Sequence, residues 1–173
     1  MQYGTFTRPV TEADVRPLSL DPADLADLRS CVPGACDIRM GARTVQEIGA
    51  AGDWRAATAA DQSNTWARSA LVSLVTDYQQ RGNAALHVHD DRGTAIDAGD
   101  LWQSMLAQPS AASVLAPALQ RYLDAYPTSP ASEATDLIYW DRQRLTGLKS
   151  LVGVTHLVTW RDPAHSDRVI VAQ

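Results

Sequence analysis

The stretch Leu151-Val-Gly-Val-Thr-His-Leu-Val-Thr-Trp-Arg161 decides the fold class of this chain of 173 residues. It is rich in Val, Leu and Thr, and in an extended chain the alternate residues from Val152 to Trp160 share one face. A loop at 162–167 separates it from a second apolar run, Val169-Ile-Val171, which predicts a returning strand. We therefore expect an antiparallel hairpin in the C-terminal part of the chain.

Helical patterns dominate the sequence before this hairpin. From Ala59 to Arg81, apolar residues recur at spacings of three and four, and Gly82 is well placed to end the helix. Asp21 and Pro22 are a typical capping residue and first residue of another helix. Shorter helices are expected near three further segments, which are Thr44–Ile48, Leu101–Leu106 and Leu115–Tyr126.

Together these patterns predict an α+β fold, with a mostly helical N-terminal two-thirds followed by a small antiparallel sheet. We expect a single domain over residues 1–173, because this length suffices for one core. A polar linker is expected over Thr128–Thr135. The other segments expected to be extended are Tyr3–Thr7, Ala84–His89 and Leu137–Trp140.

Composition excludes several classes of protein. Hydrophobic residues make up 45% of the chain and charged residues 20%, which is ordinary for a globular protein. The net charge of −5 argues against a nucleic-acid surface, and no apolar run is long enough to span a bilayer. The N-terminus lacks the charged and apolar regions of a signal peptide. The fingerprints of phosphate and dinucleotide binding are also missing, so we expect no cofactor.

The two cysteines of the chain lie in Cys31-Val-Pro-Gly-Ala-Cys36. Pro33 and Gly34 suit the central positions of a type II turn, which would bring the two sulfur atoms together. A local disulfide is the favoured interpretation, and it indicates an oxidising compartment. Free thiols, or metal and redox chemistry, are the alternatives, although four intervening residues differ from the usual two of zinc and thioredoxin-like sites.

A pair of histidines raises the question of a metal site. His87 and His89 would point to the same face of a strand, and the segment is similar to the His-x-His-x-Asp-His motif of metallo-β-lactamase-like hydrolases. Arg92 stands where that motif has its last histidine. Too few other histidines are present to complete a two-metal set. We therefore predict no metal site and interpret the segment as a strand followed by a solvated acidic turn.

His156 is the main candidate for chemistry without a metal. It shares a face with Val154 and Val158, where a lone histidine is more often a hydrogen-bonded core residue than a catalyst. Tyr139 and Asp141 precede that strand and could converge with His156 in a small polar and aromatic site. Trp140 and Trp160 could line a ligand cavity beside it or simply cover the sheet.

The short acidic helix before Cys31 and the Cys-x-Pro-Gly-x-Cys motif lie between Leu18 and Met40. Other short segments follow in order, at Asp77–Tyr78, Gly82–Leu86, Tyr122–Pro127, Ile138–Trp140, Gly147–Lys149 and Val154–His156. In these features the chain resembles the central part of a family of uncharacterised bacterial exported proteins. The resemblance implies a piece of a longer protein in the periplasm or cell envelope. Its longer members suggest, by analogy, a helix-grip fold around an apolar cavity, and it implies no activity.

The sequence favours a non-catalytic module that binds an apolar or amphipathic small molecule, or a protein partner, against the sheet. Trp140, Trp160 and His156 are the residues expected to line such a ligand site. The alternative is a hydrolase-like enzyme that uses His156 with Asp141 or Tyr139, or a metal at His87 and His89. We also expect self-association through the strand Val169–Val171, because an apolar strand at the edge of a sheet invites pairing.

The predicted disulfide can be tested directly. We expect the protein purified without reductant to have a mass lower than the reduced chain by two hydrogen atoms, with Cys31 and Cys36 joined in one proteolytic peptide. A disulfide over so short a loop should contribute about 2 kcal/mol to the free energy of unfolding. Two alkylatable thiols in air-purified protein would contradict the prediction.

Overall fold

The structure is a computed structural model that describes residues 2–32, 42–52, 58–86, 88–89, 95–108, 117–128, 132–143, 151–163 and 169–172. Its helices are α1 (Pro22–Ser30), α2 (Ala42–Ala51), α3 (Ala59–Arg81), α4 (Ala98–Leu106) and α6 (Pro117–Ala125), with short 3-10 turns η1 (Glu12–Val15) and η2 (Gly82–Ala85). Its strands are β1 (Gln2–Thr5), β2 (Val88–His89), β3 (Ile96–Asp97), β4 (Ala134–Gln143), β5 (Leu151–Arg161) and β6 (Val169–Ala172). The predicted α+β class is confirmed.

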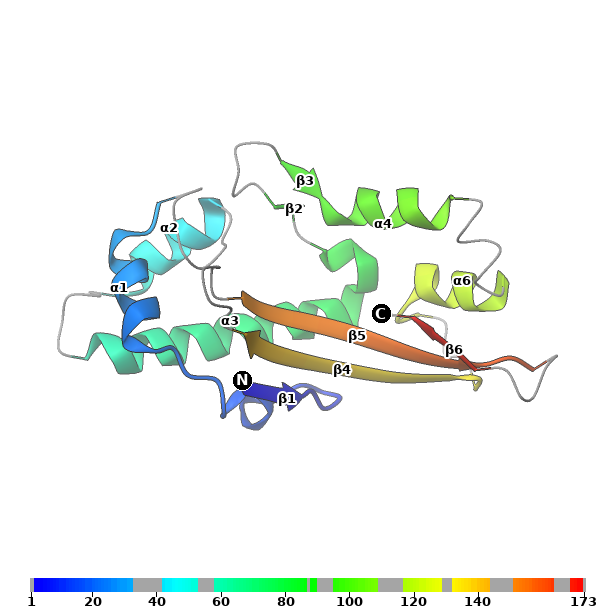
Figure 1. The fold of residues 1–173 in the computed structure, drawn as a ribbon, viewed down its shortest axis with the longest axis horizontal. Helices are drawn as coiled ribbons and strands as arrows, with labels where there is room; N and C mark the ends of the chain where they lie inside the picture. Colours follow the sequence, from blue (N-terminus) through cyan, green and yellow to red (C-terminus); the bar gives the residue numbers. More distant parts are fainter. Residues whose placement is uncertain are drawn as a thin grey trace.

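Four strands form the main sheet in the order β1-β4-β5-β6, and every neighbouring pair is antiparallel. The predicted pairing of Val169–Val171 with Leu151–Arg161 is confirmed, with Val171 opposite Thr159. The first strand, β1, comes from the other end of the chain and pairs with β4 (Figure 1). Strands β2 and β3 form a separate two-stranded sheet.

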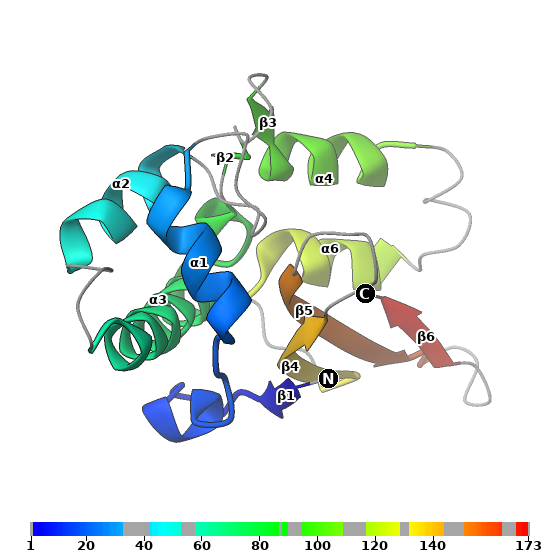
Figure 2. The ribbon, with the colours of Figure 1, turned by 60° about the vertical axis from the view of Figure 1, so that its left-hand side comes forward.

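The helices lie together on one side of the main sheet, as Figures 1 and 2 show. Even-numbered residues of β4 and β5 point toward them, because successive side chains in a strand alternate between the two faces. The largest core cluster joins α3 and α6 to this face, and its buried members are Val75, Leu119, Tyr122, Leu123, Tyr126, Ile138, Val158, Trp160 and Ile170. A second cluster places Trp140 against Val15, Leu18 and Leu71.

Helix α3 spans the residues predicted from the sequence and ends at Gly82 as expected. Gly82 has a φ of 56°, and its N–H donates to the carbonyl of Tyr78. A Cβ atom at this position would lie 1.8 Å from the carbonyl oxygen of Tyr126, so only glycine allows this close approach. Like the other described helices, α3 is not apolar enough over a sufficient length to span a membrane.

Two local predictions differ from the structure. The expected strand Ala84–His89 is wrong over its first part, because the chain continues from Gly82 into the turn η2 and pairs only at β2. Strand β4 begins at Ala134, inside the segment expected to be a polar linker. Its polar start is held by β5, since Ala134 lies opposite Trp160 and Thr135 opposite Thr159.

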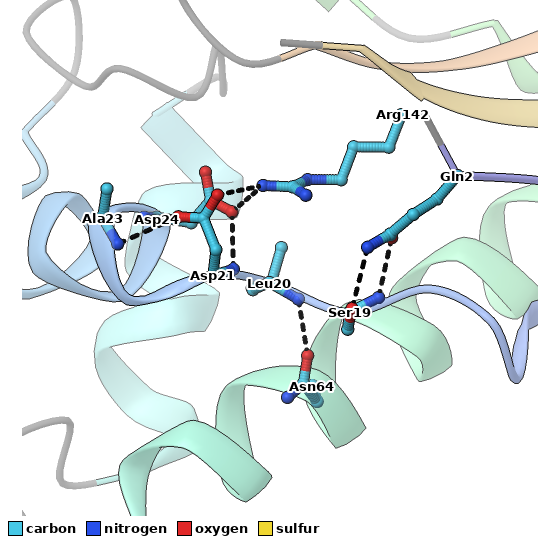
Figure 3. Close-up of polar contacts among 8 residues, drawn as sticks. All are labelled: Gln2, Ser19, Leu20, Asp21, Ala23, Asp24, Asn64 and Arg142. Atoms are coloured by element: carbon cyan, nitrogen blue, oxygen red, sulfur yellow. Dashed lines mark hydrogen bonds and ion pairs between the residues drawn. The ribbon is translucent and has the colours of Figure 1, made fainter.

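A buried ion pair between Arg142 of β4 and Asp24 of α1 connects the start of α1 to the sheet (Figure 3). The guanidinium of Arg142 contacts the carboxylates of Asp24 and Asp21, the latter at 3.1 Å. The side chains of Arg142 and Asp24 are only 10% and 2% exposed. Asp21 also accepts hydrogen bonds from the N–H groups of Ala23 and Asp24, so the predicted helix cap is confirmed.

The neighbouring segment is held by hydrogen bonds to two other elements (Figure 3). The side chain of Gln2 in β1 donates to the hydroxyl of Ser19 at 2.8 Å and accepts from its N–H at 3.0 Å. The side chain of Asn64 in α3 accepts from the N–H of Leu20 at 2.7 Å. Residues 19–24 are therefore tied at once to β1, β4 and α3.

We predict that Arg142→Met lowers the free energy of unfolding by about 3–5 kcal/mol, because it leaves the buried carboxylate of Asp24 without its cationic partner. The matched control is Arg43→Met, which breaks the exposed pair between Arg43 and Glu47 and should cost less than about 1 kcal/mol. Urea unfolding followed by circular dichroism measures both. Equal losses in the two variants would contradict the role given to Arg142.

Candidate functional site

His156 lies near the middle of β5, opposite Ile138 of β4, on the face covered by helices. This placement beside Val154 and Val158 was predicted from the strand alternation. Its side chain is 11% exposed, so the imidazole is nearly buried but keeps an edge toward solvent. A buried imidazole needs partners for its ring nitrogens, and both nitrogens have one.

The two ring nitrogens of His156 bond to a carboxylate and a phenol. Nε2 lies 2.7 Å from Oδ1 of Asp136, and Nδ1 lies 2.8 Å from the hydroxyl oxygen of Tyr78 in α3. Tyr122 in α6 donates its hydroxyl to the other carboxylate oxygen of Asp136. The result is a continuous hydrogen-bonded chain from Tyr78 through His156 and Asp136 to Tyr122.

Burial acts to raise the pKa of Asp136, but hydrogen bonds from His156 and Tyr122, with the charge of Arg8, outweigh it and lower that pKa. Asp136 is therefore ionised at neutral pH and can only accept hydrogen bonds. Nε2 of His156 must then carry a hydrogen. In the neutral imidazole Nδ1 is an acceptor, and Tyr78 donates to it.

The ring of a third tyrosine, Tyr126, packs beside this hydrogen-bonded series. The ring of Tyr126 lies 4.5 Å from that of His156 and stacks on Tyr78 at 5.3 Å, measured between centroids. Arg8 donates to the Tyr126 hydroxyl, and its guanidinium carbon lies 5.2 Å from the centre of that ring. The close approach at Gly82 positions Tyr126 beside the end of α3. We call Arg8, Tyr78, Tyr122, Tyr126, Asp136 and His156 the tyrosine–histidine cluster.

The tyrosines of the cluster stay protonated over a wide pH range. Burial, reinforced by the nearby phenol of Tyr126 and the carboxylate of Asp136, raises the pKa of Tyr78 well above its ordinary value. Burial also raises the pKa of Tyr122, and so does the hydrogen bond that it donates to Asp136. For Tyr126, burial raises the pKa against the opposing effect of Arg8. The protonated phenols of Tyr78 and Tyr122 therefore act as hydrogen-bond donors, whereas that of Tyr126 accepts from Arg8.

The predicted grouping of His156 with Tyr139 and Asp141 is wrong. Tyr139 lies opposite Thr155 and Asp141 opposite Gly153, so both side chains point to the face of the sheet away from His156. Asp136 supplies the carboxylate instead. Tyr78 and Asp136 are the hydrogen-bond partners of the two ring nitrogens of His156.

The two tryptophans proposed as ligand-lining residues do lie on the same face as His156. Trp140 is completely buried and donates its Nε1–H to the carbonyl of Asp14 at 2.9 Å. Trp160 is 3% exposed and packs against the ring of Tyr122. Both side chains therefore fill the core beneath the helices.

The other candidate residues fall partly outside the described residues. His87 and Cys36 both lie outside them, and His89 is described only by its backbone in β2. Cys31 lies at the C-terminal end of α1. The disulfide therefore stays a prediction. Among the residues that the structure describes, no group of three or more His, Cys, Asp or Glu side chains is placed to hold a metal ion.

Four members of the cluster have a signal in the sequence. Tyr78, Tyr122 and Tyr126 all stand at apolar positions of expected helices, where a tyrosine hydroxyl needs a buried partner. Asp136 precedes Ile138 by two residues and so shares its face once β4 begins at Ala134. Arg8 gave no signal, because only the fold brings it to Tyr126.

No protein-family model, curated protein or solved structure matches this chain. The resemblance to exported bacterial proteins, the helix-grip analogy and the extracytoplasmic location therefore stay predictions. The geometry itself defines the site as a partly buried, hydrogen-bonded cluster of phenols, an imidazole and a carboxylate between α3, α6 and the sheet.

The lowered pKa of Asp136 predicts how stability changes with pH. A folded-state pKa below the unfolded value of about 3.9 stabilises the protein at neutral pH, and this contribution is lost as pH falls through the folded pKa. We expect the Asp136→Asn variant to have a lower free energy of unfolding than the unchanged protein at pH 7. The difference between the two proteins should become smaller as the pH falls. Urea unfolding over a pH series measures it.

Tyr122→Phe is the companion variant. It removes one of the hydrogen bonds that lower the pKa of Asp136. As the pH falls, the variant should therefore begin to lose stability at a higher pH than the unchanged protein. An Asp136→Asn deficit that grows as the pH falls would contradict this account.

Proposed function

We propose that this chain is a protein-binding module that takes up a partner strand along β6. The supporting observation is that β6 is an uncharged edge strand with exposed apolar side chains. β6 forms one edge of the sheet, its segment Val169–Ala172 carries no charge, and its side chains Val169 and Val171 are 55% and 59% exposed. Edge strands are usually protected by charges, proline or bulges, and an unprotected one favours pairing with another chain.

The partner to which we commit is a second copy of this chain. Two β6 strands can pair antiparallel about a two-fold axis, which gives each copy the same contacts. Because the segment is uncharged, no like charges meet across the pair. Among the described residues, no strand pairs with β6 on the side away from β5.

The outer face of the sheet supports the same proposal. Tyr3 and Leu137 are exposed there together with Val169 and Val171. Several large exposed apolar side chains on one face indicate an interaction surface. The helix-covered face offers less to a small apolar ligand, since Trp140, Val158 and Trp160 there are at most 3% exposed.

Self-association can be tested by sedimentation velocity over a range of concentrations. We expect the mass to rise from the chain mass of 18.7 kDa toward twice that value, and Val171→Lys to shift this rise to higher concentration at least tenfold. Two lysines would meet near the two-fold axis and repel each other. Val171 is the suitable position because Ile170 faces the core.

The matched control is Ser73→Lys, which adds the same charge at an exposed position of α3, away from the outer face of the sheet. It should associate like the unchanged protein. A monomer at every concentration, or equal weakening by both lysines, would contradict pairing through β6.

A further inference from the structure

The three hydroxyl groups of the tyrosine–histidine cluster have three different partners. Tyr78 donates to Nδ1 of His156, Tyr122 donates to a carboxylate oxygen of Asp136, and Tyr126 accepts from Arg8. Tyr122 and Tyr126 are buried and Tyr78 is partly buried, and neighbouring rings lie 5.3 and 6.3 Å apart between centroids. A phenol that loses an electron becomes strongly acidic, so it is oxidised readily only where a base takes its proton. The three phenols therefore differ in how easily they can be oxidised.

We propose that Tyr78 is a redox-active tyrosine, from which a one-electron oxidant takes an electron while the phenolic proton passes to His156. In this step the O–H bond of Tyr78 breaks and a new N–H bond forms at Nδ1. The products are a neutral tyrosyl radical, an imidazolium ion at His156 and the oxidant reduced by one electron. Returning one electron from a reductant, with the proton moving back, restores the starting state.

The imidazole makes Tyr78 the preferred site over Tyr122. An ordinary imidazole has a pKa of about 6.5 and an ordinary aspartate about 3.9, so the imidazole is the stronger base. Asp136 is weaker still as a base, because its hydrogen bonds lower its pKa. The same carboxylate lies 2.7 Å from Nε2 of His156 and stabilises the imidazolium that forms when Nδ1 takes the proton.

The environment of Tyr126 opposes its oxidation. Its hydroxyl accepts a hydrogen bond from Arg8, and the guanidinium carbon lies 5.2 Å from the ring centre. A positive charge at this distance disfavours removal of an electron from the ring. Tyr126 nonetheless stacks on Tyr78 at 5.3 Å, which makes it a close structural control for any effect of ring packing.

The aromatic contacts give the electron a route through the core. Centroid separations are 5.3 Å from Tyr78 to Tyr126, 6.3 Å from Tyr126 to Tyr122, and 6.1 Å from Tyr122 to Trp160. An electron can cross such short gaps between rings without direct contact between Tyr78 and the oxidant. Tyr78 is itself only partly buried, so the proposal needs no pocket above its phenol.

The experiment uses the full chain with Tyr3 and Tyr139 replaced by phenylalanine. The chain has five tyrosines, so this background keeps only Tyr78, Tyr122 and Tyr126. The probe is photo-oxidised ruthenium tris(bipyridine) with persulfate as electron acceptor, at neutral pH. Electron paramagnetic resonance of freeze-quenched samples measures the tyrosyl radical and separates it from tryptophan radicals.

We expect Tyr78→Phe to reduce the tyrosyl signal to less than half, and Tyr126→Phe and Tyr122→Phe to leave most of it. A His156→Gln variant should lose the signal as Tyr78→Phe does, because the base is gone while Tyr78 remains. If His156→Gln does not fold, as judged by circular dichroism, the comparison of the three phenylalanine variants decides alone. Equal yields in the three, or a loss confined to Tyr122→Phe or Tyr126→Phe, would overturn the proposal.

Discussion

The pleat of β4 and β5 sends every second side chain to the face that the helices cover, and most of the structure depends on this alternation. Ile138, Val158 and Trp160 use it to form the main core with α3 and α6. Burying one face of a sheet fixes the register of its strands, since a slip of one residue would turn the whole apolar set to solvent. The same register places the polar residues of these strands under the helices.

Those polar residues connect the sheet to the helices one by one. Arg142 bonds to the first turn of α1, His156 to Tyr78 of α3, and Asp136 to Tyr122 of α6. A satisfied hydrogen bond contributes about 0.5–1.5 kcal/mol, whereas a buried group left without its partner costs about 1–3 kcal/mol. These contacts therefore act mainly by making other placements of the helices on the sheet unfavourable, because those placements would leave buried polar groups without partners. The apolar clusters supply most of the stabilisation.

The two longest periodic segments were predictable from the sequence to within a residue, whereas the bounds of the shorter helices α2 and α4 differ by two or three residues. The helix Ala59–Arg81 and the strand Leu151–Arg161 agree with the structure because long periodic runs and a terminal glycine carry their own signal. Strand β4 was predicted too short, because its polar start at Ala134 is held in the sheet by β5 and not by its own composition.

The face of His156 was predictable for the same reason, but its partners were not. Tyr139 and Asp141 are close to Ile138 in sequence and yet point away from His156, since the alternation assigns them to the outer face. Tyr78 is far away in the sequence, and only the packing of α3 on β5 brings its hydroxyl to Nδ1. A chain of long-range polar contacts of this kind has no local sequence pattern.

The pairing of β1 with β4 has a consequence for how the chain folds. Gln2 lies opposite Arg142, so β1 finds its neighbour only after all the helices and β4 are present. Closing so long a loop is slow, and contacts of high sequence separation lower folding rates. During synthesis the helical segments emerge before β4 and β5, while β1 must wait unpaired. We therefore expect β1 to join last, onto a sheet that β4 and β5 have already nucleated.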